Sequence, residues 1–185
     1  NIGYVYFAQG DYSKALEYFE EVLKIRLSVY GENHSRVASV YNDIGEIYSV
    51  QGDDFKALDY FKKSLKIVLS VYGENHSQVS SIYDHIGEIY FAQKDYSKAL
   101  YYFEESLKIR LSLFGENHPE VALSYYSIGS LYIIQGDKSK ALNYYEKSLK
   151  IRLSVYGENH PLTKEIMDLI NVANSKVLQS PETTK

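Results

Sequence analysis

The tetrapeptide Gly-Glu-Asn-His occurs four times in this chain, beginning at Gly31, Gly73, Gly115 and Gly157. Each copy begins 42 residues after the copy before it. A fixed period of this size is typical of a stacked repeat array, in which each unit buries its apolar face against its neighbours. The period therefore favours a binding function over catalysis.

Composition and charge exclude several classes of protein. The formal charge is −4, and the basic residues alternate with acidic ones in every repeat, so we expect no nucleic acid partner. The absence of cysteine excludes disulfides and thiolate zinc sites, and favours an intracellular, cytoplasmic location. The apolar stretches are far shorter than a membrane span, and the N-terminus lacks the pattern of a secretion signal. We therefore expect no membrane partner.

The copy that begins at Gly31 contains two amphipathic patterns. Apolar residues recur at three- and four-residue steps over 37–48, which predicts a first helix ending near Gln51-Gly52. Asp53 is placed to cap a second helix, whose apolar positions run over 57–71. We call these helices A and B of each repeat.

Two details of the helix ends depend on single residues. Lys94 stands where the other copies have glycine, and a left-handed conformation there would cost roughly 1 kcal/mol. Cations lie near the end of each helix B, and we expect them to stabilise the negative end of the helix dipole and to aid solubility. They are Lys24, Arg26, Lys66, Lys108, Arg110, Lys150 and Arg152.

Three sets of residues share one order: an aromatic residue, an Ile-Gly pair, Tyr, Ala, a second aromatic residue and Ser. They are Tyr41, Ile44, Gly45, Tyr48, Ala57, Phe61 and Ser64; Tyr83, Ile86, Gly87, Tyr90, Ala99, Phe103 and Ser106; and Tyr125, Ile128, Gly129, Tyr132, Ala141, Tyr145 and Ser148. This order resembles the tetratricopeptide repeat, and the 42-residue period with the turn Gly-Glu-Asn-His-Pro at 115–119 is similar to the kinesin light chain type. The resemblance implies an all-α, right-handed superhelical solenoid of antiparallel helix pairs. Gly45 and Ala57 are expected to let helices A and B approach closely.

The repeat pattern predicts one domain made of successive units. They are a truncated first repeat at 1–30 (a partial helix A plus helix B), repeats at 31–72, 73–114 and 115–156, a capping helix at 157–178 and a polar tail at 179–185. The first unit lacks its opening turns, which indicates a fragment of a longer array. The apolar surface expected around Ile2 and Tyr6 favours end-to-end self-association of the fragment.

The resemblance implies that the A helices line a concave groove that holds a peptide. The corresponding positions are Ser39, Asn42, Asp43, Glu46 and Val50; Ser81, Asp84, His85, Glu88 and Phe91; and Leu123, Tyr126, Ser127, Ser130 and Ile133. Carboxylates in the first two sets, beside apolar residues in the third, predict a protein or peptide partner that carries basic and apolar residues.

The family's known specificities fit these positions poorly. The carboxylate clamp for chaperone tails needs Lys, Asn and Arg, and this chain has Asn42, Asp43, Glu46, Ser81 and His85 there. The aromatic-acidic cargo motifs of kinesin light chains would be repelled by the acidic half. Three alternatives stay open: a structural spacer or self-association module, a regulatory array of a larger multidomain protein, or a merely solvated acidic face.

Nothing in the pattern predicts an enzyme. The histidines of the four turns, His34, His76, His118 and His160, lie one repeat apart, which is roughly 10 Å, whereas zinc bonds are about 2 Å long. Paired carboxylates such as Glu20-Glu21 fall on an exposed helix face. No phosphate-binding loop or serine nucleophile motif has a suitable context. We expect no catalytic, cofactor or metal site.

Overall fold

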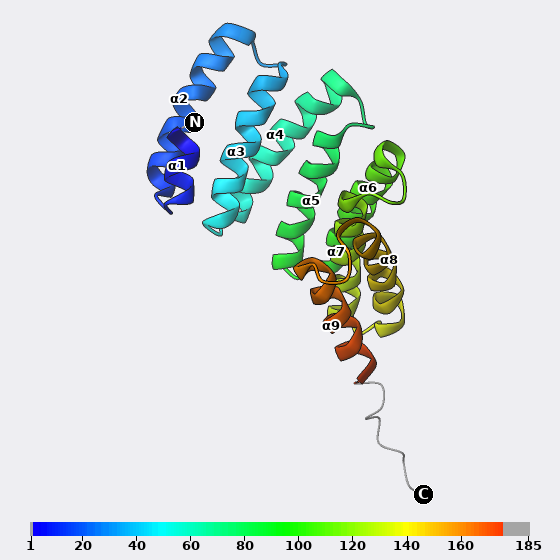
Figure 1. The fold of residues 1–185 in the computed structure, drawn as a ribbon. Helices are drawn as coiled ribbons and strands as arrows, with labels where there is room; N and C mark the ends of the chain where they lie inside the picture. The colour runs from blue at the N-terminus through cyan, green and yellow to red at the C-terminus, as the bar shows by residue number, and fades with distance from the viewer. Residues whose placement is uncertain (1, 176–185) are drawn as a thin grey trace, which may run out of the picture. The chain divides into compact units, whose positions relative to one another are not determined.

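The computed structural model describes residues 2–175, and α-helices account for most of them (Figure 1). The helices are α1 (Ile2–Ala8), α2 (Tyr12–Tyr30), α3 (Ser35–Val50), α4 (Asp54–Tyr72), α5 (Ser77–Ala92), α6 (Tyr96–Phe114), α7 (Pro119–Gln135), α8 (Lys138–Tyr156) and α9 (Pro161–Ser175). No strand occurs between residues 2 and 175. The predicted all-α architecture of paired helices is confirmed.

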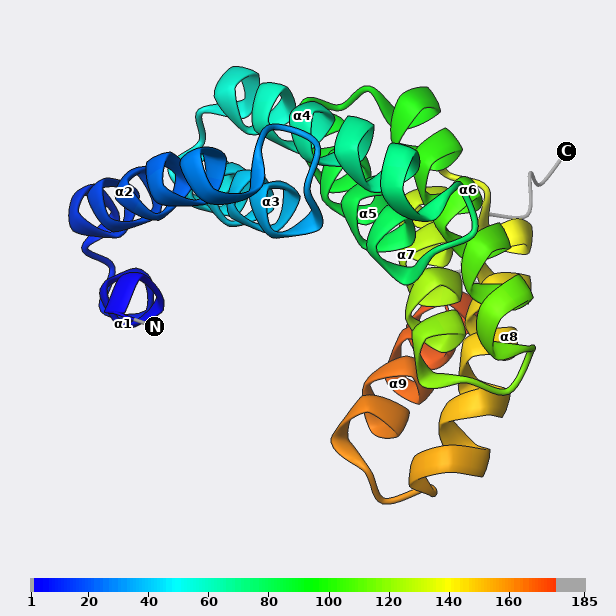
Figure 2. The ribbon, with the colours of Figure 1, turned by 90° about the horizontal axis from the view of Figure 1, so that it is seen from above.

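The contacts divide the chain into two compact units, Asn1–Tyr102 and Phe103–Lys185, and α6 contributes to both. In the first unit, each helix from α1 to α4 packs on the next helix along the chain. Figure 2 shows the A helices α1, α3 and α5 on one side of this unit and the B helices α2 and α4 on the other. In the second unit, α7 packs on α8, and α8 packs on α9.

The turn from helix A to helix B forms as its residues predict. Gly52 has a φ of 77°, which glycine adopts without a steric penalty. The side chain of Asp53 accepts a hydrogen bond from the backbone N–H of Lys56 over 3.2 Å and so caps α4. Lys94, at the equivalent of Gly52, has a φ of 62°, so it adopts the left-handed conformation and bears the cost of roughly 1 kcal/mol.

The turn from helix B to helix A uses a histidine and an aromatic residue. The Nδ1 atom of His76 accepts a hydrogen bond from the backbone N–H of Gln78 over 3.2 Å, which caps α5. The His76 ring stacks on Tyr72, the last residue of α4, with centroids 4.2 Å apart. The same stack forms at the three equivalent turns. The conserved geometry of these joints explains why the tetrapeptide marks the period.

The packing of helices A and B depends on a glycine opposite an aromatic ring. A Cβ atom added to Gly45 would lie 2.8 Å from the ring of Phe61, which is fully buried. At the equivalent Gly129, an added Cβ would lie 2.7 Å from the ring of Tyr145. The predicted close approach at Gly45 therefore occurs, and the second aromatic residue of the repeat is its partner.

The last described helix, α9, begins at Pro161, directly after the fourth Gly-Glu-Asn-His turn. Its residues Thr163 and Ile166 are fully buried, and the helix contacts α8. The predicted polar tail at 179–185 and the last residues of the predicted capping helix lie outside the described residues. No helix within residues 2–175 is both long and apolar enough to cross a membrane.

Candidate binding face

The candidate binding face of each unit lies on its A helices. The predicted residues are Ser39, Asn42, Asp43, Glu46 and Val50 on α3; Ser81, Asp84, His85, Glu88 and Phe91 on α5; and Leu123, Tyr126, Ser127, Ser130 and Ile133 on α7. The first two sets belong to the first unit and the third set belongs to the second unit.

Glu46 lies at the centre of a polar network that joins α3 to α5. The side-chain amide of Asn42 donates a hydrogen bond to Glu46 Oε1 over 2.6 Å. His85 Nε2 lies 3.4 Å from the same oxygen. The His85 ring also stacks on the buried ring of Phe61, with centroids 5.0 Å apart and planes 5° from parallel. The structure thus brings together three of the predicted residues and fixes the orientation of the histidine.

Three carboxyl groups of this face have raised pKa values. Burial raises the pKa of Glu46, and the charge of Asp43 raises it further. Burial also raises the pKa of Asp43, although the hydroxyl of Tyr4, which donates a hydrogen bond to it over 2.7 Å, acts in the opposite direction. Burial and the charge of Asp84 raise the pKa of Glu88. Positive charge within the unit therefore does not offset the desolvation of these groups.

On the face of the second unit, Tyr126 is bound by side chains of α8 and α9. The hydroxyl of Tyr126 donates a hydrogen bond to Glu165 Oε1 on α9 over 3.0 Å. The guanidinium of Arg152 lies 5.0 Å from the centroid of the Tyr126 ring and 3.5 Å from Glu165 Oε2. Arg152 also donates a hydrogen bond to the backbone carbonyl of Leu162 over 2.6 Å. Tyr126 is thus held within the unit by α8 and α9.

The predicted serines mostly serve the scaffold. Ser39 Oγ accepts a hydrogen bond from Arg26 over 2.7 Å. Ser130 Oγ accepts one from the hydroxyl of Tyr145 over 3.2 Å. Ser127 is half-buried on α7. Ser39 and Ser130 therefore connect neighbouring helices, and their contacts give no direct sign of a ligand.

The predicted apolar residues are partly exposed. Phe91 packs against Tyr96 at the start of α6, with ring centroids 6.0 Å apart. On α7, Leu123 is 45% exposed and Ile133 is 37% exposed. Ile133 also lines a cavity of about 200 Å³ together with Leu169 of α9. Apolar surface is therefore present on the face of the second unit.

The arginines near the end of helix B correct one prediction. Arg110 and Arg152, expected to be solvated, are only 5% and 4% exposed. Arg110 lies 2.8 Å from Glu120 and donates a hydrogen bond to Ser124 over 2.8 Å. Arg26 reaches Ser39 of the next helix A in the same way. These arginines tie each helix B to the following helix A, and their recurrence at the 42-residue period was the signal in the sequence.

The four turn histidines act as helix caps. The Nδ1 atoms of His34, His76, His118 and His160 each accept a backbone N–H hydrogen bond over 3.1–3.2 Å. In the part of the chain that the structure describes, no group of three or more histidine and acidic residues could hold a metal ion. Each of these histidines therefore caps the helix A that follows it.

Comparison with known proteins identifies the repeat. The model of the tetratricopeptide repeat family matches residues 1–69, 36–112 and 78–154. Among curated proteins, none matches this chain.

Solved structures with the same fold include three informative examples. BtubC (BKLC) from P. vanneervenii superposes with a TM-score of 0.79 at 20% identity, over 99% of this chain and 81% of that chain. A putative kinesin light chain from Podosopora anserina with nearly identical TPR-like repeats gives 0.74 at 16% identity, over 97% and 94%. The apo form of RapI gives 0.80 at 18% identity, over 95% and 61%. These likenesses show a helical repeat fold of the kind found in kinesin light chain-like proteins.

Proposed function

This chain belongs to the tetratricopeptide repeat family, whose members are generally non-catalytic scaffolds for protein interactions, and from this premise we propose that its first unit binds a basic segment of a partner protein. The proposed site is the face formed by α3 and α5. The observation that supports it is the set of partly desolvated carboxyl groups of Asp43, Glu46 and Glu88, whose pKa values are raised.

Desolvation accounts for the preference for a cation. It is the largest influence on the pKa of all three carboxyl groups, so their charged forms are destabilised in the unbound protein. A lysine or arginine from a partner would favour the charged forms and offset part of that cost. An acidic segment would add repulsion. The expected ligand is therefore basic, either as an extended peptide or along one face of a helix.

An apolar contact lies beside these charges. Val50 follows Glu46 by one helical turn on α3 and is 55% exposed. An apolar side chain next to the basic residue of the ligand could pack there, adding affinity while the charges set orientation. The ligand class is a basic residue with an apolar neighbour.

The test is a binding measurement with neutral variants. Peptides are selected from a random library on the unmodified chain, and we expect them to combine Lys or Arg with apolar residues. Their dissociation constants are then measured by fluorescence anisotropy. The double substitution Glu46→Gln and Glu88→Gln is expected to weaken binding at least about tenfold, or 1.4 kcal/mol. Glu20→Gln with Glu21→Gln removes the same charge from the exposed face of α2 and should leave affinity within about twofold.

Salt provides a second measurement on the same complex. Affinity should fall as ionic strength rises, because the interaction depends on opposite charges at a partly exposed surface. Equal affinity of the two double variants, or selection of acidic peptides, would contradict the proposal.

A second candidate function is self-association through α1. Its residues Ile2 and Val5 are 56% and 54% exposed, an apolar surface suited to a second copy. Light scattering across a range of protein concentrations should then show a dimer in the unmodified chain and a monomer after Ile2→Glu with Val5→Glu. A monomer at all concentrations in both proteins would exclude it.

A further inference from the structure

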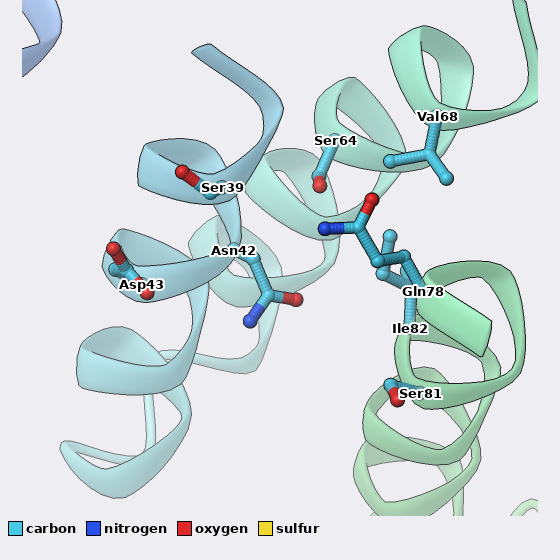
Figure 3. Close-up of a pocket in the computed structure, with 8 residues that line it drawn as sticks. All are labelled: Ser39, Asn42, Asp43, Ser64, Val68, Gln78, Ser81 and Ile82. Atoms are coloured by element: carbon cyan, nitrogen blue, oxygen red, sulfur yellow. The ribbon is translucent and has the colours of Figure 1, made fainter. Parts of the chain in front are cut away.

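A cavity of about 120 Å³ opens between α3 and α5, with α4 beneath it (Figure 3). Its lining residues include Ser39, Asn42, Asp43, Val68, Gln78 and Ser81. Figure 3 shows the side chains of Asn42, from α3, and Gln78, from α5, extending into the space between the two helices. Six of its eight lining residues have polar side chains and two are apolar, and the cavity is large enough for several water molecules or for one planar polar group.

The repeats differ at one position beside this cavity. Residues 26, 68, 110 and 152 are equivalent at the 42-residue period, and they are Arg, Val, Arg and Arg. Each of the three arginines extends from helix B to the next helix A, where it donates to Ser39, Ser124 or the backbone carbonyl of Leu162. Val68 cannot make such a bond. The cavity therefore lies where the other repeats place a guanidinium group.

One hydrogen-bond acceptor in this cavity is left without a donor. The amide nitrogen of Asn42 is committed to Glu46 Oε1 at 2.6 Å, which turns Asn42 Oδ1 away from that carboxylate. Asn42 Oδ1 is buried and has no hydrogen-bond partner among the described residues. A buried acceptor without a donor is destabilising, so this atom favours a ligand that carries N–H groups.

We propose that this cavity binds the side chain of an arginine from the partner, in the place that Arg26 and Arg110 occupy in their own repeats. The proposal rests on the proposed function and names the residue that the partner inserts. The guanidinium donates to Asn42 Oδ1 and Ser81 Oγ, and the carboxylate of Asp43 supplies the opposite charge. The aliphatic part of the side chain packs against Val68 and Ile82, which also line the cavity.

Arginine fits this cavity better than lysine for a geometric reason. The guanidinium is planar and presents five N–H donors in a fixed arrangement, so it can bond two acceptors and face a carboxylate at once. The ammonium group of lysine is a strongly hydrated point charge. The repeats themselves show the preference, since the equivalent position is occupied by arginine three times and by lysine at none of the four.

The first experiment uses single amino acid derivatives. N-acetyl-arginine amide is titrated into ¹⁵N-labelled protein, with N-acetyl-citrulline amide as the neutral analogue of equal shape and N-acetyl-lysine amide as the second cation. We expect saturable shifts of the amide signals of Asn42, Gln78 and Ser81 with the arginine derivative. The lysine derivative should bind at least fivefold more weakly, and the citrulline derivative should give no saturable shifts. Equal responses to all three compounds would overturn the proposal.

The second experiment fills the cavity. Val68→Arg should recreate the internal contact of the other repeats and weaken arginine binding at least tenfold, while circular dichroism shows an unchanged helical fold. Phe55→Arg adds the same group to the same helix at a site that is 82% exposed, and it should not change the affinity. Asn42→Leu removes the acceptor Oδ1 without filling the cavity with a guanidinium group, and it should also weaken binding. Retained affinity in both cavity variants would overturn the proposal.

These experiments separate the two proposals. If selected basic peptides bind and depend on Glu46 and Glu88 but are insensitive to Val68→Arg, the acidic face is correct and the arginine pocket is wrong. If the arginine derivative binds as expected and no basic peptide does, the pocket is correct and the proposed function fails.

Discussion

The candidate binding faces of the two units share one scaffold, but their carboxylates have different partners. In the first unit, Glu46 is bonded to a neutral amide and its pKa is raised. In the second unit, Glu165 accepts a hydrogen bond from Tyr126 and lies beside the buried Arg152. The two carboxylates therefore differ in their partners: Glu165 lies beside a buried cation of its own unit, whereas Glu46 accepts a hydrogen bond from an uncharged amide, and we propose that Glu46 is available to a basic partner.

The largest expected effect comes from removing the internal cation of the second unit. Arg152→Ala should lower the free energy of unfolding by about 3 kcal/mol, because the buried guanidinium bonds the carbonyl of Leu162 and faces Glu165. Urea denaturation followed by tyrosine fluorescence measures the loss. Arg36→Ala, on the exposed surface of α3, is the control and should cost under about 0.5 kcal/mol. Equal losses would mean that Arg152 does not close this face.

The next effect tests whether the scaffolds of the two units are equivalent. Gly45→Ala and Gly129→Ala place a methyl group 2.8 Å and 2.7 Å from an aromatic ring in the first and second unit. Each should destabilise the protein by about 2 kcal/mol, since the ring must shift to make room. Thermal denaturation would show similar decreases in Tm. A large difference between the two variants would mean that the packing of helices A and B itself differs between the two units.

A smaller and equal effect is expected at the turns. His76→Ala and His118→Ala each remove a side chain that accepts a hydrogen bond at the start of a helix A, over 3.2 Å in both turns. Loss of such a cap costs about 1 kcal/mol. The free energies of unfolding of the two variants should agree within about 0.5 kcal/mol. Disagreement beyond that margin would show that the joints differ between repeats.

Neutralising one carboxylate in each unit should give effects of opposite sign. Glu46→Gln should stabilise the protein by up to about 0.5 kcal/mol, because burial disfavours the charged form. Glu165→Gln should destabilise it by about 0.5 kcal/mol, because its partners are a hydroxyl donor and an arginine. Chemical denaturation of both variants decides the sign. Two changes of the same sign would contradict the proposed difference between the partners of Glu46 and Glu165.

The smallest expected effect is the pH dependence of the difference in stability between Glu46→Gln and the unmodified chain. The pKa of Glu46 is raised in the folded protein, so between its ordinary value and the raised value the folded state binds more protons than the unfolded state. Stability from this group therefore increases as the pH falls through the raised pKa. The advantage of Glu46→Gln over the unmodified chain should be largest at pH 7 and shrink toward pH 4.5. An advantage that grows on acidification would contradict the raised pKa.

Much of the fold could be predicted because local signals repeat. Gly52 and Asp53 form the predicted turn and cap, and Lys94 adopts the conformation of the glycine that it replaces. Such features depend on a few adjacent residues, so the sequence specifies them without knowledge of packing. The aromatic ring that packs against Gly45 could not be predicted in the same way, because it depends on which side chain of helix B points toward helix A.

The candidate face was less predictable for a physical reason. The position of Glu46 on helix A followed from the repeat, but its raised pKa depends on burial and on neighbours from another helix. The hydrogen bond from Tyr4 to Asp43 joins residues 39 positions apart, and no motif marks it. The sequence predicts solvated cations at the end of helix B, because helix-end cations usually are exposed, whereas the structure buries Arg110 and Arg152. The replacement of arginine by Val68 in one repeat was the available sign that one junction differs.

The joints between repeats also make this chain suited to recombination in whole units. Tyr30 and Tyr72 each end a helix B, stack on the histidine of the following turn and precede a glycine with the same backbone conformation. A chain in which Tyr30 is followed directly by Gly73 would therefore recreate a complete joint, with the caps of both helices intact. The residues lost would include Val68 and the carboxylates of α3. A gene could thus gain or lose the proposed specificity by exchanging one 42-residue segment, without altering the turns that hold the array together.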